Sequence, residues 1–382
     1  MSGRESRVLL KMHNAQIAYT VDSSNASERA AMMPETLEAR TRSANCPALG
    51  RLKVLFVTNM YPDDANPGSG AFVSQQAEHL RKAGHQIDVL HIESGKSRLK
   101  YLTAPIDVFG RTRATAYDVV HAHYGLSGFP ALFRYKTPLV ITLHGSDALV
   151  GRIQPLISKT VCALADAVIV VSKGISARIA GEIIPCGIDL EVFRPRDRAA
   201  ARVRLGLPAR GKLVLFPFDP LRKIKRYELA RAAVDTLRDP DTQILTVCGK
   251  RNEDMPWYYS AADAMVLCSQ SEGSPTSVKE ALACNLPVVS TDVGDVREIV
   301  DGIEGCEICD ASAEHFGQGL KRALGRRIDK PFEGRLSMQR YDQSRIVTAI
   351  VKVYERVIHD RFGGRRQQTQ SHFPENRNTA QQ

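Results

Sequence analysis

Short apolar runs alternate with stretches of helical periodicity from residue 51 onward. Runs of this length, rich in Val, Ile and Leu, are typical of strands buried on both faces of a parallel sheet, with helices covering those faces. A first series of strands is expected at 54–57, 87–90, 119–121, 139–142 and 168–171. A second series is expected at 213–216, 244–247, 265–267 and 288–290. The pattern therefore predicts the same α/β arrangement twice.

The length of the chain also favours two domains. A chain of 382 residues with 43% hydrophobic residues is longer than one core usually serves and apolar enough to fill two. We place an amino-terminal domain at 51–190 and a carboxy-terminal domain at 191–340, with the boundary in the Pro- and Arg-rich stretch 189–208. A final helix at 341–362 is expected to pack back toward the first domain.

The two ends of the chain show no pattern that would support a core. Residues 1–50 carry scattered charge without a sustained period and are expected to form a weakly ordered extension. Residues 363–382, rich in Gln, Arg and Asn, are expected to form a disordered tail. No run approaches the ~18 consecutive apolar residues of a membrane-spanning helix, and no signal-peptide pattern opens the chain. We therefore expect a cytoplasmic protein.

The net charge of +10 suggests an anionic partner, and its distribution narrows the choice. Segment 96–113 holds five cations against the single acid Asp107, and these are Lys96, Arg98, Lys100, Arg111 and Arg113. Such a cluster is compatible with a solvated surface or with peripheral contact to the anionic inner face of a membrane. Nucleic acid is disfavoured, because no interleaved aromatic residues and no helix-turn-helix pattern accompany the cations.

Cysteine and glycine spacings argue against two further classes of protein. Cys306 and Cys309 have the spacing of half a metal or redox site, but no second Cys or His pair lies at a zinc-ribbon distance. The glycines of 66–72 do not follow the G-x-G-x-x-G spacing of dinucleotide-binding enzymes. We therefore expect no metal and no cofactor.

The segment 269–283, directly after the expected strand 265–267, carries the richest chemistry. Pro275 is suited to the first position of a helix, and Gly273 and Ser274 allow close approach of the backbone to a ligand. A helix that begins at the carboxyl end of a strand is a ready site for a phosphate group. This segment is therefore expected to bind a phosphorylated ligand.

Two carboxylates belong to the same segment. Thr276 and Glu280 lie one turn apart on a helix face distinct from its apolar stripe, and Glu272 precedes the helix. Ionised carboxylates are good acceptors for sugar hydroxyl groups. In isolation, a solvated Glu on a surface helix would be the more ordinary interpretation of such a carboxylate.

The spacing of Glu272 and Glu280, in a Glu-Gly-Ser-Pro setting followed by Lys-Glu-Ala-Leu-Ala, resembles glycosyltransferase family four. Further similar segments are 119–123, 142–145, 171–173, 258–263, 285–291 and Gly294, so that the resemblance covers roughly 51–360. It implies the GT-B fold, in which two Rossmann-like domains face each other across a cleft. It also implies retaining transfer of a sugar from a nucleoside diphosphate-sugar to a hydroxyl group of a polysaccharide, a lipid-linked glycan or a small molecule.

The resemblance assigns the donor side as follows. Glu272 would contact the donor sugar and Glu280 the ribose, and Gly273, Ser274, Pro275 and Thr276 would line the donor site near the pyrophosphate. Lys225 matches the cation that neutralises the departing diphosphate, a role that needs no metal. The family's Arg normally stands five or six positions earlier, where this chain has Asp219 and Pro220, which leaves Arg222 as the nearest candidate.

On the acceptor side, the resemblance points to the glycine-rich loop 66–72, with Gly68 and Gly70, and to the ends of two strands. His144 matches a cleft histidine near the transferred sugar, Asp147 follows in the same loop, and His123 is a further candidate.

Other functions on the same fold stay open from sequence. These are a catalytically degenerate nucleotide- or sugar-binding module and a nucleotide-sugar epimerase.

Overall fold

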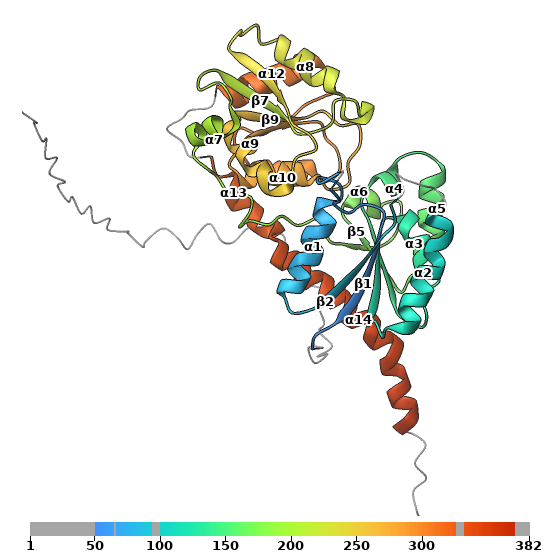
Figure 1. The fold of residues 1–382 in the computed structure, drawn as a ribbon. Helices are drawn as coiled ribbons and strands as arrows, with labels where there is room; N and C mark the ends of the chain where they lie inside the picture. The colour runs from blue at the N-terminus through green and yellow to red at the C-terminus, as the bar shows by residue number, and fades with distance from the viewer. Residues whose placement is uncertain (1–49, 65, 94–99, 326–331, 371–382) are drawn as a thin grey trace, which may run out of the picture. The chain divides into compact units, whose positions relative to one another are not determined.

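The computed structural model describes residues 50–64, 66–93, 100–325 and 332–370. It contains two parallel sheets, each flanked by helices on both faces (Figure 1). Residues 1–49 and 371–382, which hold nearly all of the expected extension and part of the expected tail, lie outside the described residues, as do Lys96 and Arg98. In the described part, no helix is long and apolar enough to cross a membrane.

The first sheet has the strand order β2-β1-β3-β4-β5-β6. Its strands are β1 Lys53–Thr58, β2 Gln86–His91, β3 Val119–His123, β4 Leu139–Leu143, β5 Ala167–Val170 and β6 Glu182–Ile183. Every residue of β3 and β4 is buried, as the continuous apolar runs predict. The sequence did not indicate β6, because two exposed residues at a sheet edge carry no pattern.

Helices cover both faces of this sheet. They are α1 Ala71–Lys82, α2 Lys100–Ala114, α3 Gly125–Ala131, α4 Ser146–Leu149, α5 Ile153–Cys162 and α6 Lys173–Ser176. α2, α3 and α5 pack on one face through Ala104, Val108, Ala131 and Val161, whereas α1 packs on the other. Figure 1 shows α2, α3 and α5 side by side along one flank of the domain.

The second sheet has the order β11-β10-β9-β7-β8. Its strands are β7 Lys212–Phe216, β8 Thr242–Thr246, β9 Ala264–Leu267, β10 Val288–Ser290 and β11 Glu307–Ile308. The flanking helices are α7 Arg198–Leu205, α8 Tyr227–Asp235, α9 Met255–Ala261, α10 Thr276–Ala283, α11 Val296–Val300 and α12 Ala313–Leu324. Short 3-10 turns lie at Lys223–Lys225 and Asn252–Asp254. α9, α10 and α11 pack on one face, and α8 and α12 on the other.

The chain returns to the first domain at its carboxyl end. The chain leaves the second domain through α13 Gly334–Ser337 and the turn Met338–Tyr341. The backbone of Asp342 then pairs with that of Ile188, in the segment where the chain first passes from one domain to the other, and α14 Gln343–Gln370 begins. Apolar residues of α14, among them Ile350, Val353 and Tyr354, pack with α1 against the first sheet. The backbone of α14 stays helical to Gln370, eight residues beyond the 362 at which the sequence pattern ends it.

Candidate active site

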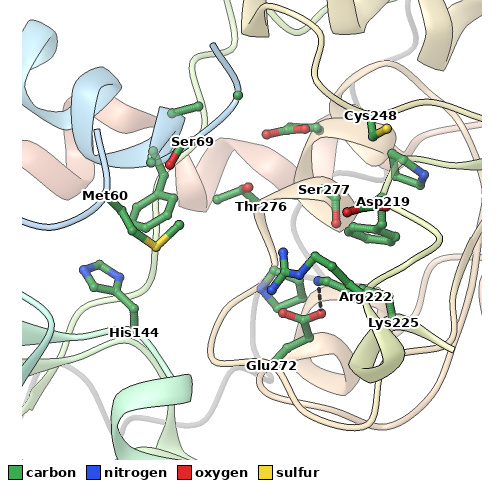
Figure 2. A pocket seen from close by; sticks show the side chains of 18 of the residues that line it. Met60, Ser69, His144, Asp219, Arg222, Lys225, Cys248, Glu272, Thr276 and Ser277 are labelled. Carbon is green, nitrogen blue, oxygen red and sulfur yellow. Dashed lines mark hydrogen bonds and ion pairs between the residues drawn. The ribbon is translucent and has the colours of Figure 1, made fainter. Parts of the chain in front are cut away.

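A cleft of about 660 Å³ lies between the loops at the carboxyl ends of the two sheets (Figure 2). In Figure 2, Met60 and His144 of the first domain lie on one side, and Arg222, Lys225 and Glu272 of the second lie on the other. Ligands of open α/β sheets bind at this end of the strands, because the strand termini place loops there. The cleft therefore lies at the end of the sheets where this kind of fold binds its ligands.

Gly145 of the first domain lies against Gly273 of the second, and Gly294 of the second domain packs against Gly273 as well. A Cβ atom on Gly145 would lie 2.7 Å from the backbone nitrogen of Gly273, and one on Gly294 would lie 2.5 Å from the carbonyl oxygen of Gly273. Gly145 and Gly294 also have positive φ angles, of 124° and 61°. Side chains at these positions would force the backbones apart. The absence of side chains therefore allows the loop before α10 to reach His144.

The donor-side residues expected from sequence gather around the start of α10. Gly273, Ser274, Pro275 and Thr276 all line the cleft. Pro275 caps α10, whose first residue is Thr276, so the helix begins one position later than the sequence indicated. The start of α10 thus lies at the cleft, and the free backbone N–H groups of a helix N-terminus are what a phosphorylated ligand requires.

Lys225 and Glu272 form an ion pair in the cleft, with 2.5 Å between Nζ and Oε1. The ammonium group of Lys225 also lies 4.1 Å from the centre of the Phe218 ring. Burial lowers the pKa of Lys225, and the neighbouring carboxylate of Glu272 opposes this shift. Arg222 is exposed and lines the same cleft three residues earlier. The buried cation Lys225, the exposed cation Arg222 and the carboxylate of Glu272 thus share one wall.

Glu280 lines the cleft from inside α10 and is almost fully buried. The Tyr259 hydroxyl group donates a hydrogen bond of 2.7 Å to its Oε2 atom. Burial raises the pKa of Glu280, and hydrogen bonds from Tyr259 and Thr276 counteract the rise. Glu280 is therefore a fixed acceptor and not the solvated surface residue that the helix pattern alone also allowed. Tyr259 lies in the segment 258–263 that carries part of the resemblance, but the sequence assigned it no role.

His144 lines the cleft and is the outermost of three stacked histidines. Its Nε2 atom lies 3.2 Å from Nδ1 of His123, and its Nδ1 atom lies 3.8 Å from Sγ of Cys186. His121 continues the row inward and contacts the hydroxyl groups of Tyr354 and Thr142. Burial lowers the pKa of His121 and of His144 to about 3 and that of His123 well below its usual value.

The acceptor-side role expected for His123 is corrected by this arrangement. His123 has no exposed surface and lines neither described cavity, because the ring of His144 stands between it and the cleft. A residue at the end of a buried strand can point into the cleft or away from it, and the sequence did not distinguish these cases. His123 contacts His144 from the side of the protein interior.

The remaining residues expected on the acceptor side line two different cavities. Gly68 and Gly70 line the main cleft, and Gly70 has a φ of 63° with the backbone of Met60 against it. Asp147 lines a smaller cavity of about 80 Å³, which shares Met60, Tyr124 and Ser146 with the cleft. Its buried carboxylate accepts hydrogen bonds from backbone N–H groups, including 2.8 Å from Gly145. Asp147 therefore holds the turn that carries His144.

A buried ionic network behind the donor loop was missed from sequence. The Nζ atom of Lys279, which has no exposed surface, donates to Ser274 Oγ at 2.5 Å and to the carbonyl oxygen of Cys186 at 2.8 Å. Asp295 accepts from Ser274 at 2.6 Å and pairs with Lys279. The position of Lys279 beside Glu280 is the only hint in the sequence. This network ties the donor loop to the crossover between the domains.

Two family models match the chain in succession. "Glycosyltransferase Family 4" matches residues 67–192, and "Glycosyl transferases group 1" matches residues 222–326. The first match covers the amino-terminal side of the cleft and the second covers Arg222, Lys225 and α10. Together they take in more than half of the chain, which belongs to the family-four, group 1 glycosyltransferases.

Individual relatives agree with this class. A Bacillus subtilis protein named as a candidate teichuronic acid biosynthesis glycosyltransferase, TuaC, is 27% identical over 358 residues, which cover 73% of this chain and 91% of that protein. Sucrose-phosphate synthase from Thermosynechococcus elongatus has a TM-score of 0.69 at 22% identity, with 81% of this chain and all of that chain covered. Anabaena Alr3699/HepE in complex with UDP has a TM-score of 0.60 at 17% identity, covering 79% and 99%. The two solved structures establish the GT-B fold.

In the described part of the chain, no group of three or more His, Cys, Asp and Glu side chains is placed to hold a metal ion.

Proposed function

We propose that this glycosyltransferase moves a sugar from a nucleoside diphosphate-sugar to a hydroxyl acceptor with retention of the anomeric configuration and without a metal or cofactor. The observation that carries the proposal is the wall of the cleft on which Arg222, Lys225, Glu272 and the start of α10 meet. Such a wall has cations for a diphosphate, backbone groups for its oxygens and a carboxylate for sugar hydroxyls.

Each donor-side group has a distinct task in this proposal. Glu280, held by Tyr259, accepts hydrogen bonds from the ribose. Lys225 leaves its apo partner Glu272 when the diphosphate binds, which frees Glu272 to accept from hydroxyls of the sugar. The charge that develops on the departing diphosphate is then stabilised by Lys225 and Arg222 without any reorganisation of water.

The acceptor would enter from the first domain, past Met60 and the loop with Gly68 and Gly70. His144 faces the place of the reacting sugar, and its low pKa keeps the ring neutral at neutral pH, so that it acts as a hydrogen-bonding group. In the front-face mechanism that we propose for this retention, attack and departure occur on one face of the sugar. A diphosphate oxygen then takes the acceptor's proton.

Thermal unfolding with UDP, GDP or ADP tests the donor site first. UDP is a natural starting point, because HepE of Anabaena was solved with UDP and with UDP-glucose. A nucleotide at 100 times its Kd should add about 2.7 kcal/mol of stability, a rise of several degrees. Glu280→Gln should reduce this rise, whereas Glu253→Gln, an exposed carboxylate of the same domain, should not. No rise with any nucleotide would contradict the donor site.

Turnover then separates transfer from binding or epimerisation. With the stabilising nucleotide as the donor, release of nucleoside diphosphate should depend on an acceptor, should persist in a chelator, and should yield a product with the donor's anomeric configuration by NMR. Inversion would refute the retaining mechanism, and loss of turnover in the chelator would refute metal independence. Binding without acceptor-dependent release would favour a degenerate binding module.

A further inference from the structure

Three neighbouring helices of the first domain expose rows of large apolar side chains. On α2, Leu102, Ile106 and Phe109 follow the spacing i, i+4, i+7, and the first two are each 72% exposed. This row faces away from the core, because Ala104, Val108 and Thr112 are the residues of α2 that are buried. α2 is therefore apolar on both its inner and its outer side.

The adjoining helices continue this surface. On α5, Ile153 and Leu156 are 74% and 65% exposed, and the stretch that ends α3 exposes Phe129, Phe133 and Tyr135. The Phe109 and Tyr135 rings lie 5.9 Å apart, which joins α2 to that stretch. α3 packs against both α2 and α5, and Figure 1 shows all three on one flank. We call these exposed residues, with the cations around them, the α2–α3–α5 face.

Exposed cations surround the apolar rows. They are Lys100, Arg111, Arg113, Lys136, Arg152 and Lys159. Over residues 100–164, all of which the structure describes, Asp107 is the only exposed acid, since Asp118 is half-buried and Asp147 is buried. Arg113 and Lys136 lie over the Tyr135 ring at 5.6 and 5.2 Å from its centre, so basic and apolar groups are intermixed.

We propose that the α2–α3–α5 face docks on an anionic phospholipid bilayer. Rows of Leu, Ile and Phe beside Lys and Arg are the composition that settles at the boundary between head groups and acyl chains. The apolar rows alone would also suit a second copy of the chain. Two copies that met face to face would, however, oppose the same set of cations, and this like-charge contact is costly. An anionic bilayer neutralises the charges and covers the apolar groups together.

Docking would place the acceptor side of the cleft near the lipid surface. Helix α5, which exposes Ile153 and Leu156, also contributes Gln154 and Ile157 to the smaller cavity. That cavity shares residues with the main cleft. An amphiphilic acceptor held in the bilayer could then present its hydroxyl group to the cleft, a consequence that rests on the proposed transfer reaction, whereas the docking itself does not.

Flotation of the full chain with vesicles tests the docking. At low salt the protein should bind vesicles that contain phosphatidylglycerol far better than vesicles of phosphatidylcholine alone, and salt should weaken the binding. Arg111→Gln with Lys136→Gln should lower the partition coefficient about 25-fold, because each cation near an anionic surface contributes about fivefold. Leu102→Gln with Ile106→Gln should lower it about tenfold or more, because both side chains would no longer leave water on docking.

Matched controls keep the test decisive. Val203→Gln with Leu336→Gln removes two exposed apolar side chains from the second domain, and binding should stay unchanged. Unaltered Tm values would show that the variants fold. Absence of binding at low salt, or binding that both face variants retain in full, would overturn the proposal. A dimer in solution that Leu102→Gln with Ile106→Gln dissociates, without vesicle binding, would instead assign the face to a second copy. None of these results depends on sugar transfer.

Discussion

Replacing Gly273 by alanine tests whether the close approach of the two domains matters for the reaction. A methyl group on Gly273 would lie 2.6 Å from the carbonyl carbon of His144 and 3.1 Å from the nitrogen of Gly145, both in the first domain. Non-bonded carbon atoms settle at about 3.5–4.0 Å from each other. The donor loop must therefore retreat from the first domain by about 1 Å.

A retreat of this size should affect transfer far more than donor binding. Misplacement of reacting groups by about 1 Å costs about 100-fold in rate, which corresponds to about 2.7 kcal/mol. The nearest atoms to the new methyl group belong to the other domain, so the second domain can fold and bind nucleotide as before. We expect kcat/KM to fall about 100-fold, with the Kd for nucleoside diphosphate and the Tm almost unchanged.

Acceptor-dependent release of nucleoside diphosphate measures kcat/KM, and calorimetry measures the nucleotide Kd. Gly174→Ala is the matched control, because a methyl group there meets nothing within 4 Å. A Gly273→Ala enzyme that folds and retains kcat/KM within about threefold of the parent would refute the reasoning, since the domains would then react without this approach.

Two further outcomes follow from charges in and behind the cleft. Lys225→Met should lower kcat about 100-fold, because the cation proposed to bind the diphosphate is lost. The control is Lys223→Met, since Lys223 is exposed and lies outside the cleft, and this variant should keep its kcat. Equal kcat values for both variants would contradict the role of Lys225. The free energy of unfolding should fall as the pH drops below 6.5. Burial keeps the pKa of His121 and of His144 at about 3 in the folded protein. Between pH 6.5 and pH 3, therefore, these two side chains take up protons only in the unfolded chain. Each should cost about 1.4 kcal/mol per pH unit, measured by urea unfolding. His144→Asn should reduce this slope, and an unchanged slope would argue against a neutral His144 ring in the folded protein.

Much of the fold follows from local pattern. Strands such as Leu139–Leu143 are buried on both faces and therefore apolar throughout, which makes them visible in the sequence. Edge strands such as Glu182–Ile183 are short and exposed, and they leave no such trace. Glu272 and Glu280 were expected in the cleft because their spacing resembles a family motif, and Lys225 because it matches a family cation; all three line the cleft.

The sequence by itself determined the two α/β domains, the family and the position of the loop before α10, because these depend on periodicity and on residues close together in the chain. Only the tertiary structure decided which strand-end histidine reaches the cleft, since His123 and His144 come from neighbouring strands and one ring covers the other. It also decided that Lys279 joins the donor loop to Cys186, 93 positions earlier. The exposed rows on α2 and α5 became apparent in the same way, because an apolar residue in a helix points to core or to solvent only once the helix has packed.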